Sequence, residues 1–112
     1  MNHYNLNMLE EMTGGDRDFM TEMAKAFVEE VAEDVRAMNE AIDYENAALT
    51  YQVAHKMKPN LQMFGLQLTS EIEQLEAWSK SILTKPEILP SAKKITDKVS
   101  KAISELQSDF DL

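Results

Sequence analysis

Residues 17–42 read RDFMTEMAKAFVEEVAEDVRAMNEAI, and the pattern of this stretch indicates a helical fold. Acidic side chains, Asp34 among them, occupy many of the positions between its large apolar residues. The apolar residues recur at steps of three and four: Phe19, Met23, Phe27, Val31, Val35, Met38 and Ile42. This spacing predicts an amphipathic helix of about 25 residues whose apolar stripe faces a core.

Towards the N-terminus, a shorter segment shows the same spacing. Leu6, Leu9 and Met12 precede the pair Gly14-Gly15. Glycine commonly ends a helix because it adopts left-handed backbone angles without a steric cost. We therefore expect a short leader helix, with Asp16 capping the long helix that follows.

Towards the C-terminus, the apolar phase predicts a third helix over residues 44–64, ending before Gly65, and a fourth over residues 68–83. The fourth helix could instead begin at Ser70, because Ser70 and Glu73 have the spacing of a capping box.

A fifth helix should follow the two helix-breaking prolines, with Pro90 in its first turn. Residues 109–112 are expected to fray. The inward-facing residues of this helix are predicted to be Ala92, Ile95, Val99, Ala102, Ile103 and Leu106. Short connections favour antiparallel neighbours, so the predicted fold is all-α: an up-down four-helix bundle with a short N-terminal leader helix and a helical C-terminal segment.

The charge of the chain is strongly acidic and uneven. The formal net charge is −9, with twelve acidic and three basic side chains in residues 1–53 and eight of each in residues 54–112. Nucleic-acid binding needs a basic surface to displace counterions, so we expect no nucleic-acid partner, and an anionic membrane is disfavoured for the same reason. The chain has no cysteine and no visible secretory signal, and a cytoplasmic location is expected.

Methionine is frequent, with eight in the chain. Most are expected in the core, although Met63 could instead form an adaptable rim for a partner. The set assigned mainly to the core is Met8, Met12, Met20, Met23, Met38 and Met63.

His55 lies on the solvent side of the predicted third helix. At about 100° per residue, Val53, Met57 and Phe64 fall opposite His55, with Leu61 close to them. These four residues define the buried stripe, so the imidazole should face solvent. The side chains that share its face are Ala48, Tyr51, Pro59 and Gln62, with Lys58 about 60° away.

Pro59 affects the backbone beneath this histidine. Proline has no N–H to donate to the carbonyl four residues earlier, which belongs to His55. The helix either ends at Lys58 or continues with a kink, and the apolar phase carried on by Leu61 and Phe64 favours continuation. Ala54 and Gly65 lie beside the His55 face and would allow close approach of another backbone, although Gly65 could equally serve as a helix cap.

The segment AHKMKPNLQMFGL, residues 54–66, resembles the phosphorylation motif of histidine phosphotransfer (HPt) domains. It has the Ala-His pair, an apolar residue two positions later, a lysine three later and a glycine ten later. The stretch TGGDRDF, residues 13–19, is similar to the Gly-Asp sequence before the family's second helix, and Phe27 matches an aromatic position. The resemblance covers most of residues 4–83. The departure is Pro59, where many members have glycine.

The resemblance implies that residues 1–112 form a single HPt domain. His55 would accept the phosphoryl group and Lys58 would stabilise it. The candidate docking face for a partner consists of Tyr51, Pro59, Gln62, Met63 and Gly65. Gln74 and Trp78 lie in the region where some members carry a fourth-helix residue that assists the phosphate.

The resemblance also implies the partners. Response-regulator receiver domains would give and take the phosphoryl group in a cytoplasmic phosphorelay, and a hybrid histidine kinase is a further candidate partner. The chain shows no nucleotide-binding motif, so we expect a monomeric phosphoryl carrier rather than an enzyme. We expect no cofactor or metal of its own, since Mg²⁺ would belong to the receiver. Two alternatives stay open: a helical docking or inhibitory module, and a receiver phosphatase without stable phosphohistidine.

Overall fold

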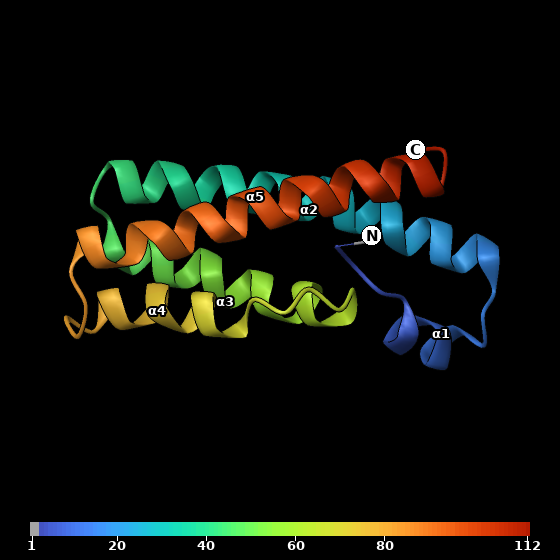
Figure 1. The fold of residues 1–112 in the computed structure, drawn as a ribbon, viewed down its shortest axis with the longest axis horizontal. Helices are drawn as coiled ribbons and strands as arrows, with labels where there is room; N and C mark the ends of the chain where they lie inside the picture. The colour runs from blue at the N-terminus through green and yellow to red at the C-terminus, as the bar shows by residue number, and fades with distance from the viewer. Residues whose placement is uncertain (1–2) are drawn as a thin grey trace.

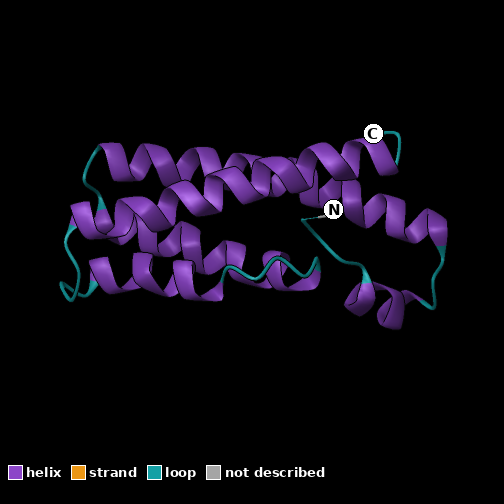
Figure 2. Cartoon of the chain, in the orientation of Figure 1, coloured by secondary structure: helices purple, strands orange, loops and turns teal. Residues whose placement is uncertain are grey.

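The computed structural model describes residues 3–112, which form five α-helices in an up-down arrangement (Figure 1). The helices are α1 (Asn7–Thr13), α2 (Arg17–Asp43), α3 (Ala47–Met63), α4 (Thr69–Ser79) and α5 (Lys85–Asp109). Within the described residues no strand is present (Figure 2). Helix α2 packs on α3 and α5, and α4 packs on the same two helices. This ring of four confirms the predicted all-α bundle.

The bundle is uneven at one end, where α2 and α5 extend past the shorter α3 and α4 (Figure 1). The leader segment and α1 cover this end. Tyr4 is buried there and its hydroxyl donates to the Asp109 carboxylate. The Asn5 N–H donates to the carbonyl of Phe64 at 2.9 Å, which ties the leader to the end of α3.

Phe110, within the C-terminal segment expected to fray, is packed against the bundle, whereas Asp111 and Leu112 after it are exposed. Phe110 is only 6% exposed. The Arg17 guanidinium lies 4.2 Å from the centre of its ring and also donates to the carbonyl of Asp109 at 2.8 Å. A cation over an aromatic face is attracted by the ring quadrupole. The contact comes from a residue more than ninety positions away, which local composition does not reveal.

The predicted helix ends are confirmed at α1 and α2. Gly14 ends α1 with a φ of 68°, and the Asp16 side chain accepts the N–H of Phe19 at 3.1 Å. The third helix begins at Ala47 instead of residue 44, because Glu45 has a φ of 56° and interrupts the helical backbone. Asn46 supplies its cap.

The fourth helix is shorter than predicted. It ends at Ser79, and Ser81 follows with a left-handed φ of 62°. Ile82, which lies inside the predicted range of this helix, is outside the observed helix and is 70% exposed. Ser70 lies inside the helix, so the capping-box start is wrong and the start near Leu68 is right.

The fifth helix begins earlier than predicted. The Thr84 N–H donates to the Glu87 carboxylate at 3.0 Å, and this capping arrangement starts the helix at Lys85. Pro86 therefore occupies the first turn, and Pro90 lies inside the helix. The first-turn role assigned to Pro90 was wrong because the capping pair lies further upstream.

The buried face of α2 is rotated from the predicted stripe near its start. Phe19 is 53% exposed, and Met20 and Ala24 are buried instead. Met8 and Met12 of α1 are also exposed, so the core assignment fails for these two methionines. The buried residues of α2 include Phe27, Val31 and Met38, as predicted.

None of the helices in the described residues is long and apolar enough to span a membrane.

Two buried carboxylates join neighbouring helices through lysines. Asp34 of α2 is 4% exposed and accepts from Lys56 of α3 at 3.1 Å. Glu71 of α4 is 8% exposed, and the Lys94 ammonium of α5 lies 2.8 Å from its Oε1. Each pair satisfies a charge that burial would otherwise penalise.

Glu71→Gln should weaken the bundle in a pH-dependent way. The hydrogen bond from Lys94 holds the pKa of Glu71 below its ordinary value of 4.5. The ionised form of Glu71 is therefore favoured in the folded state. The ion pair stabilises the fold fully above about pH 4.5, and this stabilisation is lost as the pH falls through the lowered pKa of the folded state. Urea unfolding at pH 7 should show a loss of about 1 kcal/mol in the free energy of unfolding.

The difference between wild type and Glu71→Gln should shrink below about pH 4.5. Glu73→Gln, which removes an exposed carboxylate from the same helix, serves as the control and should change little. If Glu71→Gln lowers the free energy of unfolding by the same amount at neutral and acidic pH, the assignment of the ion pair is contradicted.

Candidate functional site

His55 is exposed near the middle of α3, as the helical phase predicted. On the same helix Met57 is fully buried and Leu61 is 2% exposed. Asn46 caps the helix by accepting the N–H of Leu49 at 3.0 Å. Among the residues that the structure describes, no group hydrogen-bonds to the His55 ring, so the site presents a solvent-accessible imidazole on a well-anchored helix.

Tyr51 stacks on His55 from one turn earlier. The two ring centroids are 5.8 Å apart and the ring planes differ by 4°. Parallel rings at this separation form an offset stack. Because Tyr51 is half-buried against the bundle, the stack restricts the orientation of the imidazole.

Helix α3 continues through Pro59 to Met63, which confirms the continuous-helix prediction over an end at Lys58. Pro59 is exposed. The His55 carbonyl thus lacks its usual donor four residues later, on the face that carries the imidazole.

Two lysines flank His55 and point to different helices. Lys56 donates to Asp34 of α2, and this hydrogen bond raises the pKa of Lys56 above its ordinary value. Lys58 lies towards α4, with its Nζ 3.7 Å from Oε1 of Glu76 and its side chain 28% exposed. Of the two, Lys58 is the lysine that makes no hydrogen bond to its carboxylate.

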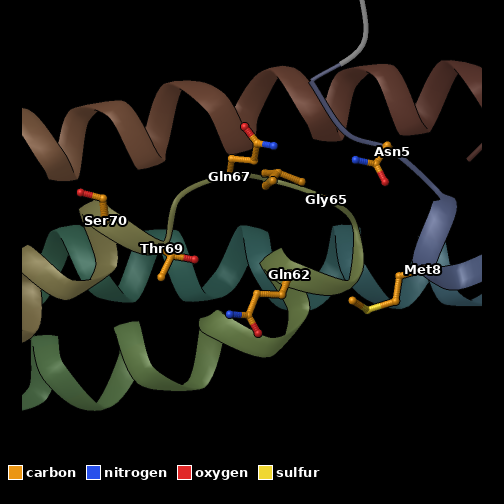
Figure 3. A pocket seen from close by; sticks show the side chains of 8 residues that line it. Asn5, Met8, Gln62, Gly65, Gln67, Thr69 and Ser70 are labelled. Carbon is orange, nitrogen blue, oxygen red and sulfur yellow. The ribbon is translucent and has the colours of Figure 1, made fainter.

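The predicted docking residues fall into separate surroundings. Tyr51 and Pro59 lie beside His55 on α3, while Met63 is half-buried and packs against the core. Gln62 and Gly65 line an open hollow of about 550 Å³ at the end of α3. Figure 3 shows this hollow between α3, the start of α4 and the leader; it is lined by Asn5, Met8, Gln62, Gly65, Leu66, Gln67, Thr69 and Ser70.

Gly65 combines the two roles considered from the sequence. Its φ of 69° fits a residue just after a helix end, and a Cβ there would clash with the Asn5 side chain. The close approach is therefore to the chain's own leader. Ala54 is fully buried, so its small side chain serves the bundle core and not an approaching partner.

A second hollow, of about 380 Å³, lies one turn before His55. Tyr51 and Gln52 of α3 face Ser79 and Lys80 at the end of α4 across it, with Ala48 completing the lining. The hollow places the cationic Lys80 near the Tyr51 side of the histidine.

The fourth-helix residues singled out from the sequence do not contact Lys58. Gln74 accepts from the Ser91 hydroxyl of α5, and Trp78 packs against the core. The residue of α4 that reaches Lys58 is Glu76, which sequence analysis missed. Nothing in the local sequence distinguishes Glu76 from the other acidic residues of α4. Its contact with Lys58 follows from the antiparallel packing of α3 and α4. Within residues 3–112, no three His, Cys, Asp or Glu side chains form a metal-binding group.

Comparison of the chain with protein families, with curated proteins and with solved structures gave no match.

Proposed function

We propose that this chain is a histidine phosphotransfer carrier, with His55 as the phosphoryl acceptor. The observation that carries the proposal is the exposed imidazole of His55, stacked on Tyr51 and flanked by Lys58 on a capped helix. The residues match in type and spacing the HPt motif that the segment 54–66 resembles.

The chemistry requires a nucleophile that an acyl phosphate can reach. A neutral imidazole nitrogen attacks phosphorus, a P–N bond forms, and the P–O bond to the donor's aspartyl carboxylate breaks. The ring keeps its proton on the other nitrogen. A second receiver reverses the step by attacking phosphorus with its own aspartate. Receiver domains supply the Mg²⁺, and this chain supplies the nucleophile, a cation and a rigid surface.

The surroundings of His55 suit a protein partner. The imidazole has a hollow beside Tyr51 on one side and the hollow at Gln62 towards the other end of α3. Met8, which is 48% exposed, extends the hollow at Gln62 with an adaptable apolar side chain. We propose that a receiver covers the surface from Tyr51 to Met8, and that its active aspartate comes opposite His55.

The test is a two-stage transfer assay. A receiver phosphorylated with labelled phosphoramidate, together with Mg²⁺, is mixed with this chain, and an unphosphorylated second receiver is then added. Label should move to the chain and from there to the second receiver. Loss of receiver label as free phosphate, without label on the chain, would identify a phosphatase. Binding with unchanged receiver label would identify a docking or inhibitory module. Either result would overturn the proposal.

A further inference from the structure

Glu76 is a partly buried carboxylate that lies beside the lysine of the candidate phosphoryl site. Its side chain is 13% exposed, and its Oε1 is shielded from solvent and accepts no hydrogen bond among the described residues. The cation near this oxygen is the Lys58 ammonium, 3.7 Å away. A carboxylate oxygen shielded from solvent is costly unless a cation or a donor compensates it, and Lys58 is the cation that lies beside Glu76.

The two buried carboxylates of the described residues provide a comparison with the partly buried Glu76. Asp34 is 3.1 Å from the Lys56 ammonium, and Glu71 is 2.8 Å from that of Lys94. Both pairs are close enough for a charge-assisted hydrogen bond. The Glu76–Lys58 pair is longer than either, and it is the one whose lysine follows His55 by one turn of the helix. The Lys58 side chain therefore leaves α3 one turn after the histidine and points to Glu76 without being hydrogen-bonded to it.

We infer that Glu76 is a positioning residue that holds the Lys58 ammonium beside His55 and competes with the phosphoryl group for it. The inference rests on the proposed carrier function. In the unmodified protein, Glu76 keeps Lys58 directed along the α3–α4 interface. Residues three apart on a helix have Cβ atoms about 5–6 Å apart, so the long Lys58 side chain reaches the phosphoryl oxygens by a small movement.

This competition limits the stability of the phosphorylated form. When Lys58 donates to a phosphoryl oxygen, the inward-facing Glu76 carboxylate loses part of its compensation. The negative charge of Glu76 also disfavours a second anion nearby. A carrier must release its phosphoryl group to the next receiver, and a carboxylate that draws Lys58 back favours that release.

The test measures how long phosphohistidine survives in four proteins: wild type, Lys58→Gln, Glu76→Gln and the double variant. Each is phosphorylated with phosphoramidate, a small donor whose P–N bond breaks with release of ammonia as the imidazole–phosphorus bond forms. Excess donor is removed, and loss of label from His55 is followed at neutral pH. Glu76→Gln should lengthen the half-life about fivefold, the change expected when a partly exposed ion pair no longer competes.

The double variant decides whether Glu76 acts through Lys58. With Lys58 already replaced, Glu76→Gln should change the half-life by less than about twofold. Glu73→Gln removes an exposed carboxylate from α4 and should leave the half-life unchanged. Circular dichroism of every variant monitors the helical fold.

The outcomes separate this inference from the proposed function. Wild type that is labelled on His55, with equal half-lives in wild type and Glu76→Gln, overturns the role of Glu76 and leaves the carrier function standing. Equal lengthening by Glu76→Gln in both lysine backgrounds overturns positioning through Lys58. If neither phosphoramidate nor a phosphorylated receiver labels wild-type His55, both proposals fail.

Discussion

His55→Gln should accept no phosphoryl group from a phosphorylated receiver, while keeping the fold of the wild-type chain. The exposed side chain makes no hydrogen bond within the described residues, so its replacement removes the nucleophile and little of the packing. Glutamine preserves a polar side chain on the helix but has no nucleophilic ring nitrogen. Label on the variant should stay at background under conditions in which the wild type is labelled to a plateau.

His3→Gln is the matched control, because the chain has only these two histidines. The His3 Nδ1 lies 2.5 Å from the Glu105 carboxylate and is part-buried at the end of the bundle. The variant should accept the phosphoryl group like the wild type, apart from any loss of stability. Labelling of His55→Gln, or loss of labelling in His3→Gln with the fold intact, would show that the acceptor is elsewhere.

Phe64→Ala should produce the largest loss of stability among single core substitutions near the site. Phe64 is 2% exposed, its ring centroid is 4.4 Å from that of Phe27, and its carbonyl accepts the Asn5 N–H. Removing a buried phenyl ring leaves a cavity and costs about 3–5 kcal/mol. This is a large part of the roughly 5–15 kcal/mol that stabilises an ordinary domain.

Urea unfolding followed by circular dichroism measures this loss directly. Phe19→Ala is the control, since the same residue type is 53% exposed at the start of α2 and its removal should change stability by less than about 0.5 kcal/mol. Equal losses in the two variants would contradict the packing at both positions.

Most of the fold follows from local patterns in the sequence. The long apolar periodicity predicts α2, and Gly14 and Asp16 mark the turn before it. The phase of α3 is strong enough to place His55 outward and Met57 inward. These features depend on the geometry of a single helix, so a sequence alone suffices to predict them.

The errors occur where contacts distant in sequence decide the structure. Phe19 fits the four-residue spacing, yet it is 53% exposed and the neighbouring Met20 packs into the shared core instead. Phe110 looks like part of a loose terminus, but Arg17 packs over its ring. Pro90 was assigned to a first turn that the Thr84–Glu87 capping pair places further upstream.

In the candidate site, too, contacts within one helix are predictable and contacts between helices are not. Tyr51, His55 and Lys58 lie on one helix, so their spacing in the sequence predicts that they are neighbours. Glu76 lies on another helix, and its contact with Lys58 depends on the register between α3 and α4. Single-sequence periodicity does not specify that register, and for this reason the carboxylate beside the site emerges only from the structure.

We propose that His55 carries a phosphoryl group during transfer. The most direct measurement is tandem mass spectrometry of the chain after incubation with a phosphorylated receiver and Mg²⁺, with digestion at neutral to alkaline pH. The expected result is one phosphoryl group on His55, lost on brief acid treatment and retained in alkali. An unmodified His55, or a phosphoryl group on another residue of a chain that has been labelled, would contradict the claim.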